Sequence, residues 1–449
     1  MSPPPADGIA PRREGESVLD ALYDSARRFP SRTAIRRGPD ALTYDGLRRE
    51  IESRAESIRR SPDWVALEAA DPVAFVVDFF ASRLAGRGSI AHGAQIPHLL
   101  RERREALLLR WRPTPGTPRT VFFSSGSVGE GKPAPLSDRE LLAAALGYPD
   151  PPEIDSSDRV AVGTSTAHVF GFVRGTLHPL LLGAEIVYYA PRRDPLGEAE
   201  ALGGTVVLLP GPLVTLSART SRPVRLKAVF SGGGSLTEES VAAVEARRGA
   251  PVRLGYGLTE SAGLGSRQRL ARPRRAGTSG IAAPGLAISI VDPESGAELP
   301  PGGAGVIRMA GAAVFDGYAD PDAALPFDAQ GRLDTGDLGF FDAEGELVVR
   351  GRREFSIVTQ GRTVCAEEIE NAIAEHPGIS DVAVSPQDDS FAILFVPREG
   401  AATLDADIRA FLQKRLPPFA RPRKVISVDE LPRNASGKLD RRIIASWLR

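Results

Sequence analysis

The sequence predicts an α/β protein with a large, multi-subdomain α/β N-terminal domain, which includes a β-rich subdomain, and a small mobile α+β C-terminal domain. Short apolar runs alternate with helical periodicity between residues 141 and 260, which is typical of a parallel sheet with crossover helices. Residues 288–341 instead contain short strands and Pro-Gly turns. At 449 residues the chain is also longer than a single hydrophobic core usually accommodates, so we expect more than one domain. We expect disorder in residues 1–16, a large domain over residues 17–351 and a lid domain over residues 352–449.

Composition narrows the class of protein. The 56 basic and 57 acidic residues give a formal net charge of −1, so no global field favours nucleic acid or a lipid surface. The single cysteine, Cys365, excludes an intrachain disulfide framework and a cysteine-based metal cluster. No charged-then-apolar N-terminal signal is visible, and apolar runs such as Val206–Leu216 are short and broken by prolines. We therefore expect a cytoplasmic protein with no nucleic-acid partner and no stable membrane insertion.

The N-terminal third is predicted to be mainly helical. Residues up to Glu16 are rich in proline and arginine and lack periodicity, which is why disorder is expected there. Apolar residues then recur at helical spacing in several segments, with a short strand-like run between the first two. The expected helices are Val18–Arg28, Leu42–Ile58, Val73–Leu84 and Arg101–Arg112, and the expected strand is Thr33–Ile35.

The rest of the chain alternates between strand and helix before and after the β-rich subdomain. In the large domain the expected strands are Val160–Gly163, Ile186–Tyr189, Thr205–Leu209 and Leu226–Phe230, and the expected helices are Leu141–Leu146, His168–Leu182, Pro212–Ser217 and Glu238–Arg248. In the small domain we expect helix Glu367–Glu375, strands Val382–Ser385 and Phe391–Val396, and helix Ala406–Leu416.

Two strand ends in the predicted parallel sheet carry clusters of polar residues and glycines, Ser231–Ser235 and Gly255–Glu260. Sheets of this kind bind ligands beyond the carboxyl ends of their strands. A lone glycine cluster is more often only a turn, so each cluster is a weak signal by itself. Both are nevertheless candidates for a binding site.

The stretch Thr120–Pro133 combines a β-prone run with a turn of hydroxyls and glycines that ends in Lys132. Glycines let consecutive amides turn toward an anion and a lysine adds positive charge, so the loop suits phosphate. The spacing of Gly126 and Gly131-Lys132 also fits the P-loop of nucleoside triphosphatases. Pro133 excludes that motif, because it has no hydroxyl to hold Mg²⁺ and removes an amide from the required helix start. Standing alone, the stretch would be interpreted as a flexible surface loop.

Five motifs in this order carry a resemblance to a known family. Ser124–Lys132 is similar to a T-S-G-[ST]-T-G-x-P-K loop, Tyr256–Glu260 to Y-G-x-T-E, and Asp334–Asp337 to a T-G-D corner. Gly351–Glu370 is similar to a G-R…G-x-x-V…E-I-E segment, and Pro432–Arg441 to a C-terminal lysine motif. On these residues the chain resembles the adenylate-forming superfamily, which includes acyl- and aryl-CoA synthetases, adenylation domains of nonribosomal peptide synthetases and firefly luciferase. It is most similar to the acyl- or aryl-acid ligases of the AMP-dependent synthetase and ligase family.

The resemblance implies an ATP-dependent acid–thiol ligase that uses Mg²⁺. A carboxylate would attack the α-phosphorus of ATP, release pyrophosphate and form an acyl-adenylate. A pantetheine thiol, of CoA or of a carrier protein, would then take the acyl group. The attack of an anion on a polyanion needs positive charge and oriented donors rather than a general base.

The same resemblance implies roles for individual residues. Lys132 would hold the β- and γ-phosphates, Thr259 the α-phosphate and Glu260 the Mg²⁺. Lys438 would neutralise charge between the substrate carboxylate and the ribose-phosphate; without its motif it would be interpreted as a solvated surface lysine. The other residues expected to contact the nucleotide are Ser124, Ser125, Gly126, Ser127 and Gly129 in the phosphate loop, Gly232, Gly233, Gly234 and Tyr256 beside the adenine, Gly255 and Gly257 next to them, and Asp337 and Arg352 at the ribose.

Three further positions follow from the resemblance. His168 falls at the acyl pocket, where amino-acid-activating relatives carry an aspartate, so an amino acid substrate is disfavoured. A core histidine is the alternative interpretation of His168, and both fatty and aromatic acids fit the pattern. Glu354 would act as the hinge of the lid domain, and Gly361 would let a pantetheine arm approach through a tunnel.

The sequence departs from the family pattern at several positions. Val128 and Gly131 replace the usual Thr and Pro of the phosphate loop, which would loosen it. Phe355 and Val358 replace an acidic residue and a lysine near the hinge, Val306 replaces a glutamate, and the region before the phosphate loop is shorter than usual. Two alternatives therefore stay open: an enzyme that stops at the adenylate or loads a carrier protein, and a catalytically impaired nucleotide-binding relative.

Overall fold

The computed structural model describes most of the chain and confirms the predicted α/β class. None of the helices in the described ranges is long and apolar enough to cross a bilayer. Residues 1–16, for which disorder is predicted, lie outside the residues that the structure describes. The described residues are 17–38, 40–60, 64–94, 96–111, 119–124, 131–147, 153–233, 236–359, 362–387, 390–401, 405–414, 422–433 and 439–448.

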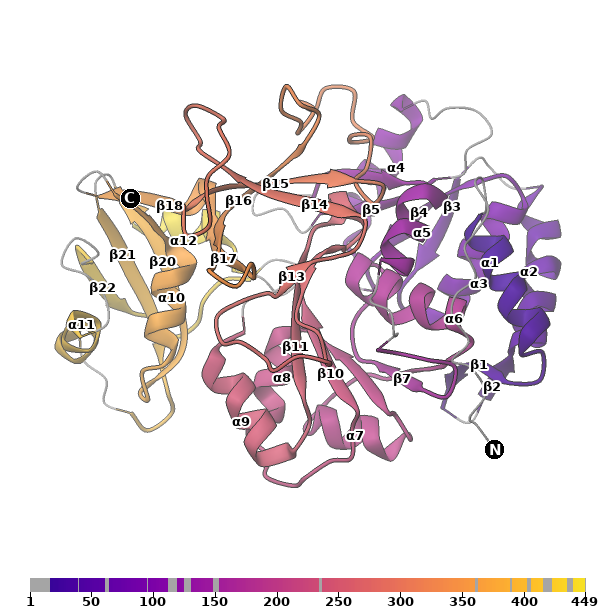
Figure 1. The fold of residues 1–449 in the computed structure, drawn as a ribbon, viewed down its shortest axis with the longest axis horizontal. Coiled ribbons are helices and arrows are strands. Elements are labelled where there is room, and N and C mark those ends of the chain that lie inside the picture. The colour runs from indigo at the N-terminus through magenta and orange to yellow at the C-terminus, as the bar shows by residue number, and fades with distance from the viewer. Residues whose placement is uncertain are drawn as a thin grey trace.

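A nine-stranded sheet lies at the centre of the larger part of the molecule (Figure 1). Its strand order is β13-β12-β11-β10-β9-β7-β8-β1-β2. The strands from β11 to β1 run parallel, as the alternation of strand and helix predicts, and the strands at both edges are antiparallel. The bounds are β1 Thr33–Arg37, β2 Asp40–Thr43, β7 Arg159–Val162, β8 Glu185–Tyr188, β9 Val206–Leu209, β10 Ala228–Gly232, β11 Val252–Gly257, β12 Gly265–Arg267 and β13 Ile281–Ala282.

The central parallel strands β7 and β9 are apolar on both faces, because helices cover the sheet from both sides. Successive side chains of a strand point to opposite faces. In β7, Val160 and Val162 belong to one hydrophobic core and Ala161 to the other. In β9, Leu208 belongs to the first core and Val207 to the second. Helices α7 Pro195–Ala201, α8 Gly211–Ser217 and α9 Glu238–Arg248 cover the second core.

Helices from the first half of the large domain cover the first core. The first of them begins at a capping box, in which Ser17 and Asp20 satisfy each other's backbone amides. The third begins where the Asp71 carboxylate accepts from two amides of the first turn. The bounds are α1 Val18–Arg28, α2 Tyr44–Ile58, α3 Pro72–Leu84, α5 Asp138–Leu146, the π-helix η1 Phe170–Leu177 and α6 His178–Leu182.

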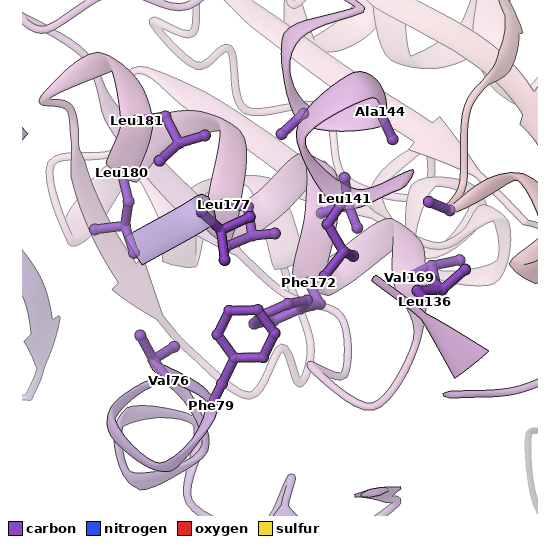
Figure 2. Packing of buried hydrophobic residues seen from close by; sticks show 14 of the residues in the cluster. Val76, Phe79, Leu136, Leu141, Ala144, Val169, Phe172, Leu177, Leu180 and Leu181 are labelled. Atoms are coloured by element: carbon purple, nitrogen blue, oxygen red, sulfur yellow. The ribbon is translucent and has the colours of Figure 1, made fainter. Parts of the chain in front are cut away.

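The ring of Phe172, on η1, lies beside the ring of Phe79 in this core (Figure 2), and its ring contacts join three elements. Its centroid lies 4.5 Å from the ring of Phe79 and 5.4 Å from that of Phe75, both on α3. It also lies 5.7 Å from the ring of Phe122 on β5. This aromatic group packs the central sheet's helices against the strand that leads into the phosphate loop.

That strand belongs to a second, four-stranded sheet in the order β3-β4-β5-β6. The first three strands are parallel, and β6 returns beside β5 as an antiparallel hairpin. The bounds are β3 Trp64–Glu68, β4 Gly88–His92, α4 His98–Arg110, β5 Thr120–Phe123 and β6 Pro133–Leu136.

The β-rich region predicted over residues 288–341 is an antiparallel sheet in the order β14-β15-β16-β17. Its last strand ends at Arg352, which pairs with Asp337 of the neighbouring strand. Arg352 therefore lies in this sheet, one residue beyond the boundary predicted for the large domain. The bounds are β14 Leu286–Val291, β15 Gly305–Gly311, β16 Leu333–Phe341 and β17 Leu347–Arg352.

The residues after β17 form a smaller α+β unit at one side of the molecule (Figure 1). It has its own core, which includes Ile369, Phe391 and Ile393. Cys365, at the end of β19, is instead fully buried in a cluster with residues of β14, β15 and β16. The bounds are η3 Arg353–Phe355, β18 Ser356–Thr359, β19 Arg362–Cys365, α10 Ala366–Ala374, β20 Ile379–Gln387, β21 Ser390–Pro397, α11 Asp405–Gln413, β22 Lys424–Ser427 and α12 Arg441–Ser446.

Several expectations about the elements need correction. The helix predicted over Leu42–Ile58 begins at Tyr44, because Leu42 and Thr43 belong to β2. The helix predicted over His168–Leu182 begins only at Phe170, and its first part is a π-helix. The helix predicted over Arg101–Arg112 begins earlier, at His98, and ends at Arg110. The sequence reasoning also missed β3, β4 and α7.

Candidate active site

The two glycine clusters at the carboxyl ends of β10 and β11 begin side by side, because Gly232 is directly opposite Gly255 in the parallel pair. A Cβ atom on Gly232 would lie 3.1 Å from the carbonyl oxygen of Gly255 and 3.5 Å from the ring of Phe170. Gly233 has a φ of +78°, a left-handed conformation that favours glycine. The glycines therefore let the backbone turn away at the strand ends without a side chain in the way. Gly234 lies outside the described residues.

The side chain of Tyr256, on β11, points to Asp337 on β16. Its hydroxyl donates to Oδ2 of Asp337 over 2.6 Å. Nε of Arg352, on β17, lies 2.9 Å from the other carboxylate oxygen, Oδ1. The Arg352 guanidinium also donates from Nη1 to the carbonyl oxygen of Thr335 over 3.0 Å. Three residues predicted to bind the nucleotide thus form one connected group.

Electrostatics keeps the Tyr256 hydroxyl protonated. Burial, reinforced by the Asp337 carboxylate, raises the pKa of Tyr256 well above its usual range. The Tyr256 hydroxyl therefore stays protonated and remains a donor to the Asp337 carboxylate.

Glu260 lies in the short 3₁₀ turn η2 Thr259–Ser261, which is separated from the end of β11 by Leu258. The residue after this turn, Ala262, has a φ of +50°, a strained conformation for a residue with a side chain. Glu260 is only 9% exposed, and its Oε1 accepts from the hydroxyl of Tyr318 over 2.8 Å. Its backbone carbonyl accepts from the amide of Phe315 over 2.9 Å. The turn that carries Thr259 and Glu260 is therefore fixed by a segment more than fifty residues away in the chain.

Lys132 lies at the end of the phosphate loop, where the chain enters β6. The Ser124 amide donates to the carbonyl oxygen of Lys132 over 3.0 Å, and the Lys132 amide donates to Oγ of Ser124 over 3.0 Å. These two bonds close the base of the loop. Because a strand and not a helix follows Lys132, the structure agrees with the exclusion of a P-loop NTPase. Ser125, Gly126, Ser127, Val128 and Gly129 lie outside the described residues.

Gly131 explains one departure from the family pattern. Its φ is +75°, whereas a proline would hold φ near −65°. A Cβ atom at this position would also collide with the carbonyl oxygen of Ser124. The backbone at the end of this loop thus follows a path that the family's usual proline cannot adopt.

Tyr318 connects the elements of the site, and the sequence analysis did not identify it. Nζ of Lys132 lies 5.1 Å from the centroid of its ring, and its hydroxyl holds Glu260. Arg352 is close enough to Glu260 and Tyr318 to interact with both electrostatically. Lys132, Tyr318, Glu260 and the group around Asp337 therefore form a single cluster. A tyrosine in an irregular segment gave no sequence signal of this role.

His168 lies in the exposed turn just before η1. The residues that follow it approach the same site, since a Cβ on Gly263 would lie 3.4 Å from the side chain of Val169. The ring of Phe170 faces Gly232, as described above. The core-histidine alternative does not fit an exposed His168, and its role at an acyl pocket stays a prediction.

The structure leaves three predicted positions with little or no description. Glu354 is an exposed residue of η3, directly after β17. Gly361 and Lys438 lie outside the described residues. The ends of the segment that carries Lys438 are held together, because Arg433 and Leu439 form an isolated β-bridge and the Asp440 amide donates to the Pro432 carbonyl over 2.8 Å.

Within the described ranges, no cluster of three or more His, Cys, Asp or Glu side chains could hold a metal ion by itself. A single buried carboxylate such as Glu260 suits Mg²⁺, which takes its other ligands from phosphate oxygens and water. The donor set therefore fits Mg²⁺ bound together with a nucleotide.

The AMP-binding enzyme family model matches residues 87–319, just over half of the chain, and a model of the AMP-binding enzyme C-terminal domain matches residues 368–438. The chain belongs to the AMP-binding enzyme family. The predicted resemblance to the adenylate-forming superfamily is thereby confirmed.

The chain is 31% identical over 348 residues to 4-coumarate–CoA ligase-like 4 of Oryza sativa subsp. japonica, in an alignment that covers 74% of this chain and 63% of that protein. It is 32% identical over 340 residues to indoleacetate–CoA ligase of Aromatoleum aromaticum, in an alignment that covers 72% of this chain and 66% of that protein. The chain thus spans less than two thirds of the length of these curated relatives. The fold also matches the structure of O-succinylbenzoate coenzyme A synthetase from Bacillus subtilis in complex with ATP and magnesium ion, with a TM-score of 0.84. The two sequences are 20% identical, and the match covers 94% of this chain and 98% of that chain.

Proposed function

We propose that this AMP-binding enzyme is an ATP-dependent acid–thiol ligase that uses Mg²⁺. The observation that carries the proposal is the cluster in which Lys132 and Glu260 meet at Tyr318, beside Asp337 with both of its carboxylate oxygens engaged. A cationic side chain, a carboxylate suited to a metal and a carboxylate suited to a ribose, brought together from three different sheets, are the set that a nucleoside triphosphate requires.

In the first half-reaction, a carboxylate oxygen of the acid forms a bond to the α-phosphorus of ATP. The bond between this phosphorus and the bridging oxygen breaks, and pyrophosphate leaves. Lys132 and Thr259 would hold the phosphates, and Lys438 would balance the negative charge that accumulates in the transition state. Mg²⁺, held by Glu260, would supply further charge neutralisation. Asp337 and Arg352 would fix the ribose.

In the second half-reaction, a thiol sulfur bonds to the acyl carbon, AMP leaves with the electron pair of the broken acyl–phosphate bond, and the thiol proton is released to solvent. We propose CoA as the thiol, because both curated relatives above are named CoA ligases. A carrier protein presents the same pantetheine thiol and serves as the second arm of the test. Gly361 would give the pantetheine arm room to enter.

For the acid, we propose an aromatic or arylalkanoic acid. The names of the two relatives refer to 4-coumarate and to indoleacetate, which are both of this class. His168, in the exposed turn before η1, offers no anion to pair with an α-ammonium group, so an amino acid is expected to be a poor substrate.

We also propose that residues 17–351 and 352–449 act as a large domain and a mobile lid, with Glu354 as the hinge. One active site must serve both half-reactions, and Lys438 is needed only for the first. The lid would therefore rotate between the two steps.

The test is pyrophosphate release by the purified chain with ATP and Mg²⁺ across a panel of aromatic, arylalkanoic, fatty and amino acids. We expect release with aromatic acids, followed by thioester formation when CoA is added. If adenylate forms and the acyl group is transferred to a carrier protein but not to CoA, then a carrier protein is the acceptor. ATP binding without pyrophosphate release from any acid would favour the impaired-relative alternative.

A further inference from the structure

The segment Phe315–Ala319 makes hydrogen bonds to both phosphate-binding elements of the proposed site. The Phe315 amide donates to the Glu260 carbonyl over 2.9 Å, and the Ala319 amide donates to the Pro133 carbonyl over 2.8 Å. Pro133 directly follows Lys132. One short piece of chain thus spans the distance between the turn that carries Glu260 and the hairpin that carries Lys132.

Tyr318 places a side chain at the centre of this bridge. Its hydroxyl donates to Oε1 of Glu260 over 2.8 Å, and its ring lies under Nζ of Lys132 at 5.1 Å. The ring of Phe315 packs edge-on against it, with centroids 5.0 Å apart and planes at 76°. Phe315 is itself buried and lies 6.0 Å from the ring of Phe327. Packing therefore fixes the Tyr318 ring before any ligand binds.

We propose that Tyr318 is a positioning residue for nucleotide binding: its hydroxyl orients the Glu260 carboxylate so that Oε2 faces Mg²⁺, and its ring face holds the Lys132 ammonium toward the phosphates. The proposal rests on the proposed function of the site, in which Glu260 binds the metal and Lys132 the phosphates. It gives one side chain two separable effects, one on the metal and one on the phosphates.

Two substitutions separate these effects. Tyr318→Phe keeps the ring under Lys132 and removes only the hydrogen bond to Glu260. Hydrogen bonds to charged groups are among the stronger ones, so we expect about a tenfold rise in the Mg²⁺ concentration that half-saturates ATP binding. Tyr318→Leu also removes the ring, and we expect a further loss of about three- to fivefold in ATP affinity at saturating Mg²⁺.

The measurement is calorimetric titration of ATP into the purified chain at a series of Mg²⁺ concentrations, with no acid present. Binding is read directly, so the result does not depend on which acid is the substrate. Tyr44→Phe is the matched control, since the Tyr44 hydroxyl donates to the Leu180 and Ala184 carbonyls in the core. That variant should lower the thermal midpoint and leave the Mg²⁺ dependence unchanged.

A double substitution identifies the partner. If the hydroxyl acts through Glu260, adding Tyr318→Phe to a Glu260→Gln variant should change the Mg²⁺ dependence little, because the carboxylate is already absent. Independent, additive losses in the double variant would overturn the proposal. So would a Tyr318→Phe curve that superimposes on wild type, or wild-type protein that binds ATP equally with and without Mg²⁺. Wild type that binds ATP with Mg²⁺ but never releases pyrophosphate would count against the ligase function alone.

Discussion

Gly131 determines the backbone path at the end of the phosphate loop. Its positive φ and the nearby Ser124 carbonyl leave no room for a Cβ atom. We expect Gly131→Ala to distort the base of the loop and to weaken ATP binding several-fold. Gly249→Ala is the matched control, because Gly249 has a similar φ of +69° and a Cβ atom there would meet nothing within 4 Å.

The two variants share the cost of a left-handed alanine, roughly 1–2 kcal/mol of unfolding free energy. Urea unfolding measures this shared cost, and ATP titration measures the local one. Equal ATP affinity in both variants would mean that the loop tolerates a side chain at position 131.

At the scale of residues, the motifs predicted which of several side chains come together in space. Tyr256, Asp337 and Arg352 are brought together as the resemblance implies, and the contact is made by side chains from three strands. Tyr318 could not be found in this way, because its contact with Glu260 joins residues 58 positions apart in an irregular segment. Such a contact depends on the path of the chain and leaves no periodic signal.

The first turn of α10 packs against the end of β17 and joins the smaller unit to the larger part of the molecule. Arg350 donates to both carboxylate oxygens of Glu368, over 2.5 and 2.7 Å. Glu367, the residue before, is turned toward Gly351, where a Cβ atom would collide with it. Its Oε2 has no hydrogen-bond partner in the described part of the chain. A bulky residue at position 351 would therefore separate these two elements.

This contact should depend on pH through Glu367. Burial, opposed by Arg441 and assisted by Glu370, raises the pKa of Glu367 from 4.5 to about 7. Because the folded pKa lies above the unfolded one, the protonated carboxyl stabilises the packed state fully below about pH 4.5. This stabilisation, about 3 kcal/mol, is lost as the pH rises through 7. We expect hydrogen exchange of the α10 amides to be slower at pH 5 than at pH 8, after correction for the intrinsic rates.

Glu367→Gln should remove that difference and protect α10 at both pH values. Glu399→Gln changes an exposed carboxylate of the same unit and should leave the pH dependence as in wild type. If the Glu367 variant kept the full dependence, another group would have to be responsible.

At the scale of elements, periodicity predicted the helices and strands that pack on one or two apolar faces. Helix α9 has the predicted bounds, and α1 likewise, because caps and periodicity agree at both ends. Strand β3 was missed, since its five residues end in alanine, leucine and glutamate, which favour a helix when taken alone. The π geometry of η1 was also beyond prediction, because a π-helix and an α-helix present nearly the same apolar pattern.

For the whole molecule, the proposed ligase makes the C-terminal lysine indispensable for the first half-reaction. We expect Lys438→Ala to abolish adenylate formation while ATP affinity stays near that of wild type, because its charge acts mainly in the transition state. Lys132→Ala should reduce activity less, since other donors hold the phosphates. Lys424→Ala removes an exposed lysine from the same unit and should have no effect. Pyrophosphate release and ATP titration decide the point, and wild-type rates in the Lys438 variant would disprove the assignment.

The two half-reactions should respond differently to changes at the hinge and the tunnel. Gly361→Leu should fill the space for a pantetheine arm, and Glu354→Pro should fix φ at the hinge, whereas Glu354→Ala should not. We expect Gly361→Leu and Glu354→Pro to form adenylate in a single turnover and to transfer the acyl group slowly. Rapid-quench measurement of adenylate and thioester in the same sample tests this. A proportional loss of both steps in Gly361→Leu would mean that this glycine supports the fold instead.

The burial of Cys365 gives the chain a reporter of its own motion. This thiol belongs to β19 of the smaller unit, yet it is covered by Val291, Val306 and Leu338 of the four-stranded sheet β14-β15-β16-β17, and burial raises its pKa to about 12. A thiol-reactive dye can modify it only when the two parts separate. Since it is the single cysteine in the sequence, the rate at which it is labelled would report how often the two parts separate, without any engineered probe. Comparing that rate with ATP, with an adenylate analogue and with CoA would follow the working cycle of the unmodified protein, one opening at a time.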